Sequence, residues 1–60
     1  MEYKFEVYKD ISGEWRFRIV APNGKIVADG GEGYKTKFFC MKNIKKLQTK
    51  LPTAYIESIV

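Results

Sequence analysis

The sequence contains few residue types that could carry out chemistry. It has no histidine and one cysteine, Cys40. A metal site needs several His, Cys or carboxylate ligands, and a nucleophilic cysteine needs a neighbouring base or another group that lowers its pKa. Cys40 also lies at helical spacing from Ile44, as a small core residue would. We therefore predict no catalytic residue, no metal and no cofactor, and we expect a protein that is not an enzyme.

One stretch could bind a small anion. Glycine-rich residues 30–33 precede Lys35, Thr36 and Lys37 at the predicted start of a helix, where free N–H groups and the helix dipole attract anions. The spacing matches neither the phosphate loop nor the dinucleotide-binding fingerprint, and Glu32 would repel a phosphate. Glycines that only let the chain turn explain the pattern more simply, so an anion site is the weakest of our functional hypotheses.

Positive charge is concentrated in the second half of the chain. Residues 1–34 hold 5 basic and 6 acidic side chains, whereas residues 35–60 hold 6 lysines and 1 acidic residue. A lysine-rich helix can bind the phosphate backbone of nucleic acid, though without the bidentate base reading of arginine. The alternative is a solvated face that keeps the protein soluble. The candidate contacts to nucleic acid or to an anion are Arg16, Arg18, Lys35, Thr36, Lys37, Lys42, Lys45, Lys46 and Lys50.

Length and composition limit the class of protein. With 60 residues and a net charge of +4, residues 1–60 are predicted to form one small domain that buries about 60% of its unfolded surface. No run approaches the roughly 20 apolar residues of a membrane span, and the N-terminus has no apolar leader, so we expect no membrane association. A single cysteine fits a reducing, cytoplasmic compartment.

Two strands joined by a tight turn open the chain. Apolar and polar side chains alternate in residues 2–9 and 14–21, which is typical of half-buried strands. A three-residue loop would pair Val7 with Phe17 on the buried face, whereas a two-residue loop would not. We therefore predict the three-residue loop, with Gly13 as its bulged residue.

A second turn and a third strand follow. Pro22 suits a type I turn with Gly24 in the left-handed conformation, although the Asn-Gly pair also favours a type I′ hairpin. The two turns place either Ile26 or Val27 on the core face, and the sequence does not decide between them. The third strand is predicted over residues 25–29, and the glycines after it predict an irregular loop with positive φ angles.

The rest of the chain predicts a helix and a last strand. Residues 37–51 show helical spacing of apolar side chains, with Thr36 as the N-cap and Pro52 ending the helix. Residues 54–59 are rich in β-branched and aromatic residues, which predicts a strand. The order β-β-β-α-β indicates a two-layer α+β domain, an antiparallel β-meander with one helix packed on one face. The predicted core consists of Phe5, Val7, Trp15, Phe17, Ile19, Cys40, Ile44, Leu47 and Ile56.

Such a sheet leaves one face uncovered. Tyr8 and Val20 would form an apolar patch on it, and Phe38 and Phe39 cannot both face the core, since adjacent helical residues point about 100° apart. The alternative is that the helix starts one residue later and that Phe38 or Phe39 fills the core from the loop. A second copy that covers these four side chains would explain them, and small domains often gain stability by association. We therefore predict a homodimer with these residues at its interface. The last strand could pair within its own chain or with the partner.

Several short blocks in a fixed order carry a family resemblance. They are Phe5-Glu6-Val7-Tyr8-Lys9-Asp10, Gly13-Glu14-Trp15-Arg16-Phe17-Arg18, Asn23-Gly24-Lys25-Ile26 and Gly31-Glu32-Gly33-Tyr34, with Ile44 and Leu47 matching an I-x-x-V step in the helix. This pattern resembles the YegP-like family of small domains of unknown function. The resemblance implies a hairpin-rich α+β domain that occurs in tandem copies or as single copies that dimerise. It implies no activity, so it adds no catalytic residue.

Three functional hypotheses follow, in this order. The first is a non-enzymatic interaction or structural module that acts as a homodimer. The second is a nucleic-acid-associated protein that binds the phosphate backbone through its lysine-rich helix, together with Arg16 and Arg18. The third is the small-anion site at the glycine-rich loop.

Overall fold

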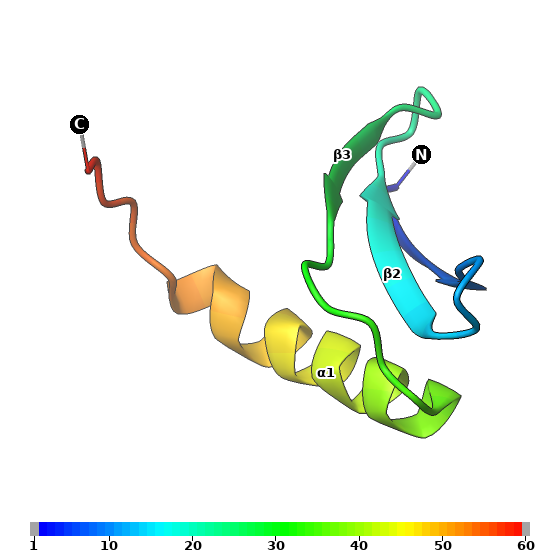
Figure 1. Ribbon diagram of the computed structural model, residues 1–60. Coiled ribbons are helices and arrows are strands. Elements are labelled where there is room, and N and C mark those ends of the chain that lie inside the picture. The colour runs from blue at the N-terminus through cyan, green and yellow to red at the C-terminus, as the bar shows by residue number, and fades with distance from the viewer. Residues whose placement is uncertain (1, 60) are drawn as a thin grey trace.

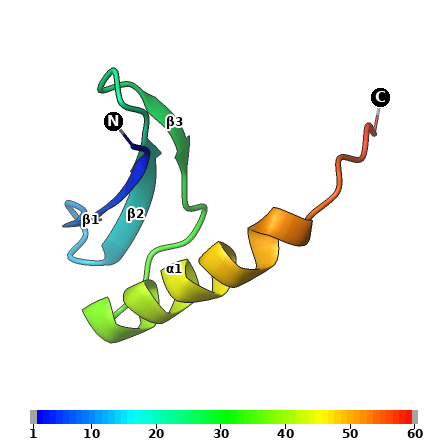
Figure 2. The ribbon, with the colours of Figure 1, turned by 180° about the vertical axis from the view of Figure 1, so that it is seen from behind.

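The computed structural model describes residues 2–59 and has three strands and one helix. The elements are β1 (Lys4–Lys9), β2 (Trp15–Val20), β3 (Ile26–Asp29), α1 (Lys37–Lys50) and a 3-10 turn, η1 (Leu51–Thr53). The strands form one antiparallel sheet in the order β1-β2-β3, and α1 lies along one side of it (Figure 1). The view from behind shows no element over the other face of the sheet (Figure 2). The predicted two-layer α+β arrangement is confirmed for these elements.

The first hairpin has the predicted register. Val7 pairs with Phe17, and Glu6 pairs with Arg18. Gly13 has a φ of 86° and its N–H donates to the Asp10 carbonyl at 3.0 Å. The three-residue loop is therefore confirmed, because only this loop length brings the apolar side chains of both strands to the same face.

The second hairpin contains an irregularity that the sequence did not indicate. The Gly24 N–H donates to the Ala21 carbonyl at 2.9 Å, and Gly24 has a φ of 87°, as expected for a type I turn followed by a left-handed glycine. The pairing of β2 with β3 then shifts by one residue, so that Ile26 lies opposite Val20 and Val27 is the extra residue. Consequently both Ile26 and Val27 are exposed.

The glycine-rich loop uses its glycines for close approach and not for positive φ angles. The positive-φ prediction is wrong here, because within residues 2–59 only the two hairpin glycines have positive φ. A Cβ added to Gly30 would lie 2.6 Å from the ring of Phe17, and one added to Gly33 would meet the side chain of Glu14. The Gly30 N–H also donates to the Phe17 carbonyl at 3.0 Å. The loop therefore runs tightly against β2.

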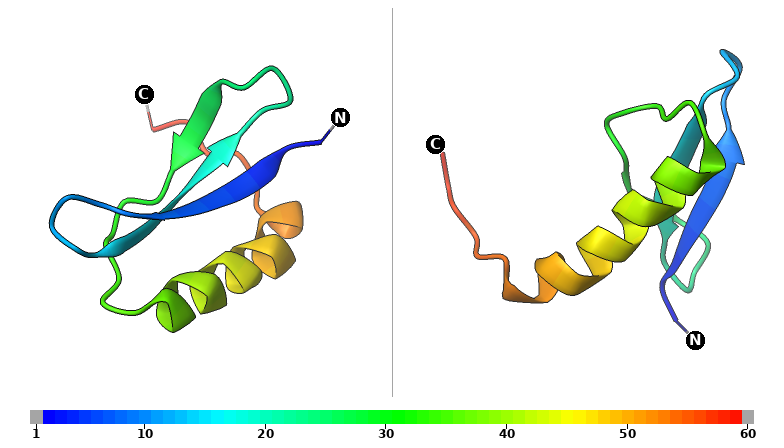
Figure 3. Two further views of the ribbon diagram at one scale, coloured as in Figure 1. Left: turned by 90° about the vertical axis from the view of Figure 1, so that its right-hand side faces the viewer. Right: turned by 90° about the horizontal axis from the view of Figure 1, so that it is seen from below.

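The helix begins and ends close to the predicted residues. The Thr36 hydroxyl accepts a hydrogen bond from the Phe39 N–H at 3.3 Å, so Thr36 is the N-cap. The helix gives way to η1, which has Pro52 in its first turn. Between residues 2 and 59, α1 packs on β2 and β1 but makes no comparable contact with β3. Figure 3 shows α1 crossing beneath the sheet.

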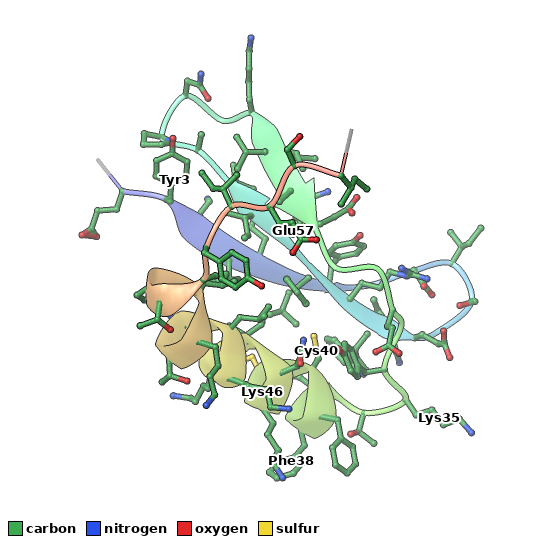
Figure 4. All side chains as sticks on the ribbon, turned by 90° about the vertical axis from the view of Figure 1, so that its left-hand side faces the viewer. Tyr3, Lys35, Phe38, Cys40, Lys46 and Glu57 are labelled. Atoms are coloured by element: carbon green, nitrogen blue, oxygen red, sulfur yellow. The ribbon has the colours of Figure 1, made fainter. Side chains whose placement is uncertain are left out.

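The core is small and lies between α1 and the first two strands. Phe17, Cys40 and Ile44 form its buried centre. Figure 4 shows Cys40 on the side of α1 that faces the sheet. Ile19, which was predicted to belong to the core, is only half-buried and lies outside this cluster. The partly buried residues packed against the centre are Phe5, Val7, Trp15, Tyr34 and Leu47.

The predicted last strand does not form in the single chain. Residues 54–59 have no regular structure, and Ile56, which was predicted to be in the core, is 99% exposed. The segment leaves η1 and runs away from the sheet (Figures 1 and 3). A strand exists only when its backbone pairs with a neighbour, and the sheet of the described chain pairs only β1, β2 and β3.

Candidate interaction surfaces

The outer face of the sheet, which is the face turned away from α1, carries charges that neutralise one another. Arg18 Nε donates to a Glu6 carboxylate oxygen at 2.8 Å, and Lys4 Nζ lies 3.2 Å from the other oxygen. The Arg18 guanidinium also lies 5.0 Å from the centre of the Tyr8 ring, a cation–π distance. These hydrogen bonds, from Arg18 first and then from Lys4, lower the pKa of Glu6.

The second arginine on this face is held by the hairpin turn. Arg16 Nε donates to Asp10 Oδ2 at 2.7 Å. Asp10 Oδ1 accepts from the Ser12 N–H and hydroxyl and from the Glu14 N–H, at 2.6 to 3.0 Å. These hydrogen bonds, that of the Ser12 side chain first and that of Arg16 next, hold the pKa of Asp10 well below its ordinary value. Arg16 and Arg18, both predicted nucleic-acid contacts, are therefore engaged with carboxylates of their own chain.

Two predicted interface residues on the outer face are largely covered within one chain. Val20 is 5% exposed and lines a shallow hollow together with Lys4, Arg18 and Ile26. Tyr8 is half-buried beneath Arg18. The outer face is thus a mixed-charge surface around a buried valine.

The first turn of α1 is capped by a side chain of the preceding loop. The Thr36 hydroxyl is occupied by the Phe39 N–H, and Lys35 is exposed in the preceding loop (Figure 4). Lys37 Nζ lies 5.7 Å from the centre of the Trp15 ring, with Lys9 at 5.6 Å. The residues predicted to bind an anion therefore do not form one site, because Thr36 caps the helix and Lys37 contacts the ring of Trp15.

The remaining lysines of the helix lie on its solvent side. Lys42, Lys45, Lys46 and Lys50 are exposed, and none takes part in an ion pair among residues 2–59. Residues three, four or seven positions apart share one side of a helix, so Lys42, Lys46 and Lys50 lie along one side. Lys45, which is exposed like the others, flanks this row on the side of a hollow that faces β1.

Two adjacent phenylalanines are exposed at the start of the helix. Phe38 is 67% exposed and Phe39 is 54% exposed, and their rings meet edge to face with centres 5.3 Å apart. Figure 4 shows Phe38 pointing away from the sheet. Both rings, predicted to be interface residues, are thus available to a partner or ligand.

A shallow groove joins the glycine-rich loop to this side of the helix. It has a volume of about 270 Å³ and is lined by Tyr34, Phe39, Lys42, Asn43 and Lys46. Partial burial, and then the Glu32 carboxylate, raise the pKa of the Tyr34 phenol, so the hydroxyl stays protonated at neutral pH. The groove combines two aromatic side chains with two ammonium groups.

The sequence analysis missed two members of this groove, Asn43 and the more informative Tyr34. Its N–H and carbonyl exchange hydrogen bonds with Trp15 at 2.8 and 2.7 Å, which extends the edge of β2 beyond β3. A tyrosine that follows a cluster of glycines gives no signal of such pairing, because the contact spans nineteen positions between Trp15 and Tyr34. Only the register of the strands determines that Tyr34 lies opposite Trp15.

The described residues contain one buried thiol and no cluster of side chains placed to hold a metal ion. Cys40 is fully buried, and burial raises the pKa of its thiol. Residues 2–59 contain no group of three or more His, Cys, Asp or Glu side chains placed to hold a metal ion. Over the same range, no helix has the length and apolar character needed to span a membrane.

Comparison with known proteins places the chain in a family. Residues 10–58 match the model of a domain of unknown function, DUF1508. This chain belongs to the DUF1508 family. It is 39% identical to a UPF0339 protein of Treponema denticola over 98% of this chain and all of that protein, and 45% identical to one of Methanosarcina acetivorans over 88% and 90%. The resemblance to YegP-like domains is thereby confirmed.

A solved structure has the same fold as the one described here. The solution structure of a protein from Haloferax volcanii superimposes with a TM-score of 0.87, at 35% identity and over 95% of both chains. The fold is therefore shared, and the family remains one of unknown function. Any role for the surfaces described above must be argued from their own chemistry.

Proposed function

We propose that this protein is a non-enzymatic interaction module that acts as a homodimer, in which the C-terminal segment of each copy adds a strand to the sheet of the other. The observation that carries the proposal is the exposure of Ile56, at 99%, in a segment whose composition favours a strand. Tyr55 and Ile59 beside it are also exposed. Three apolar side chains in water on one short segment are costly unless a partner covers them.

The sheet offers a place for such a strand. It has three strands in the order β1-β2-β3, so β1 and β3 are edges with unpaired backbone groups. An open edge is a ready template for a strand of another chain. The exposed Ile26 and Val27 on β3 add apolar surface at one edge. The interaction needs no metal, cofactor or reactive group, which agrees with the lack of catalytic side chains.

Light scattering over a range of protein concentrations tests the dimer. We expect the wild-type mass to be about twice 7.0 kDa. Ile56→Asp should give a monomer, because a buried carboxylate would be unpaired in the added strand. Ile11→Asp is the matched control, since Ile11 is fully exposed in the β1–β2 turn. A monomeric wild type, or equal masses for both variants, would contradict the proposal.

A second candidate function is binding of the nucleic-acid backbone by the helix. It is favoured by the contrast between Arg16 and Arg18, which are paired with carboxylates, and the helix lysines, which have no ion pair within residues 2–59. If Lys42, Lys46 and Lys50 contact phosphates, affinity should fall steeply with salt, with a log–log slope of about −0.7 for each phosphate neutralised on a single strand. Fluorescence anisotropy with a labelled oligothymidylate measures this slope, and an affinity that does not change with salt would exclude the function.

A further inference from the structure

We propose that the groove formed by Tyr34, Phe39, Lys42, Asn43 and Lys46 is a binding site for single-stranded nucleic acid, in which a base stacks on Phe39 and the flanking phosphates contact the two lysines. This inference rests on the second candidate function and assigns it a site and a ligand class. All five residues line one hollow of the surface. The predicted contacts Arg16 and Arg18 have no part in it.

The spacing of the residues makes a continuous strip along the helix. Phe39, Lys42, Asn43 and Lys46 occupy positions i, i+3, i+4 and i+7, which share one side of an α-helix. Lys42 and Lys46 are one turn apart, about 6 Å along the axis. Lys50 continues the strip by one more turn. An extended strand that follows the axis would therefore meet an aromatic ring first and then successive ammonium groups.

The aromatic end of the groove is held in place before any ligand binds. Tyr34 is fixed by its two backbone hydrogen bonds to Trp15. The backbone of Phe39 is fixed by the Thr36 cap. Because Phe39 is 54% exposed, a face of its ring can still be covered. Preorganised rings lose little entropy when a planar ligand stacks on them.

The charge around the groove favours an anion on one side of the helix. Between residues 35 and 56 there are six lysines and no acidic residue. The acidic group closest in sequence is Glu32, which acts on Tyr34 at the loop end of the groove. The phosphates are therefore expected beside Lys42 and Lys46 and away from the loop.

The combination of an exposed aromatic ring with two lysines favours single-stranded nucleic acid over other polyanions. A duplex presents phosphates but keeps the faces of its bases stacked inside, so the exposed ring would gain nothing from it. A single strand offers base faces that stack on aromatic rings without sequence preference. An acidic peptide or an anionic lipid surface would satisfy the lysines, but neither supplies a planar group for Phe39. Lysine without arginine also suits binding that is independent of sequence.

Matched variants measured by anisotropy with a labelled oligothymidylate test the site. Phe39→Ala should weaken binding by about tenfold, whereas Phe38→Ala, the same change at the neighbouring exposed ring, should leave it nearly unchanged. Phe39→Trp should restore binding. Lys42→Gln with Lys46→Gln should reduce the magnitude of the salt slope by about 1.4. Lys25→Gln with Lys45→Gln removes the same charge outside the groove and should change the slope much less.

The outcomes separate failure of the site from failure of the function. No binding by the wild type would overturn both the site and backbone binding. Salt-dependent binding that is equally strong for a duplex of the same length, or equally sensitive to Phe38→Ala and Phe39→Ala, would overturn the groove and leave backbone binding in place. Equal competition by polyglutamate or by phosphatidylserine vesicles would also overturn it. Fluorescence of Trp15, which packs on the core, confirms that each variant is folded.

Discussion

At the scale of single residues, Asp10 organises the first hairpin. One of its oxygens accepts three hydrogen bonds from Ser12 and Glu14, and the other accepts from Arg16. An amide in its place keeps the shape but loses the charge and one acceptor. We therefore expect Asp10→Asn to lower the thermal midpoint, whereas Glu32→Gln, an equal loss of charge in the exposed loop, should change it little.

The same residue predicts a pH dependence. The pKa of Asp10 in the folded protein lies below its ordinary value of 3.8, so its contribution to stability is present above pH ~4 and is lost as the pH falls toward the lowered pKa. Thermal melts between neutral pH and strong acid should show a steeper decline for the wild type than for Asp10→Asn. Parallel declines for the two proteins would contradict this role.

Gly30 and Gly31 are neighbours with different surroundings. A Cβ on Gly30 would meet the Phe17 ring, which is buried and cannot move aside, whereas one on Gly31 would meet nothing within 4 Å. Gly30→Ala should therefore destabilise the fold by about 1–3 kcal/mol, while Gly31→Ala should change stability by less than about 1 kcal/mol. Urea unfolding followed by Trp15 fluorescence measures both, and equal midpoints would show that the loop does not pack as described.

At the scale of elements, the helix depends on its cap. The Thr36 hydroxyl satisfies the N–H of Phe39 at the first turn. We expect Thr36→Ala to cost about 1 kcal/mol. Thr49→Ala removes the same hydroxyl from the exposed end of α1, where it donates to the Lys46 carbonyl, and should be neutral or slightly stabilising because alanine has the higher helix propensity. Circular dichroism during urea unfolding distinguishes the two variants.

Some features of the strands and the helix could be predicted from the sequence alone, and others could not. The register of β1 and β2 was predictable because a slip of one residue would turn Val7 and Phe17 to opposite faces. The helix start was predictable because a threonine cap acts through neighbouring residues only. In contrast, the bulge at Val27 depends on how β2 and β3 pair beyond their turn, where the sequence allowed two alternatives, and the pairing of Tyr34 joins it to Trp15, nineteen positions away. Because Tyr34 completes the groove, the groove could not be predicted from the sequence, although Lys42 and Lys46 were predicted as contacts.

At the scale of the whole molecule, the core is small for a stable fold. Phe17, Cys40 and Ile44 form the buried centre, while Ile56 lies outside it. A segment with strand composition but no strand is the expected result when its neighbour belongs to another copy. The sequence predicted a strand over residues 54–59, and none forms there in the single chain; the proposed homodimer would supply the neighbour that a strand needs.

Association of this kind should make stability depend on protein concentration. If folding and dimer formation are coupled, the thermal midpoint of the wild type rises with concentration by mass action. Ile56→Asp should have a lower midpoint that does not change with concentration. Calorimetry at low and high concentration tests this, and a wild-type midpoint that stays constant would show that the chain is stable alone.

The proposed homodimer is tested most directly by nuclear magnetic resonance on a mixture of isotope-labelled and unlabelled protein, with detection of contacts between differently labelled copies. We expect intermolecular contacts from residues 54–59 to the backbone of an open sheet edge, together with slow amide exchange in that segment. Tumbling at the rate of a single 7.0 kDa chain, with no intermolecular contact and with rapid exchange from residue 54 onward, would contradict it.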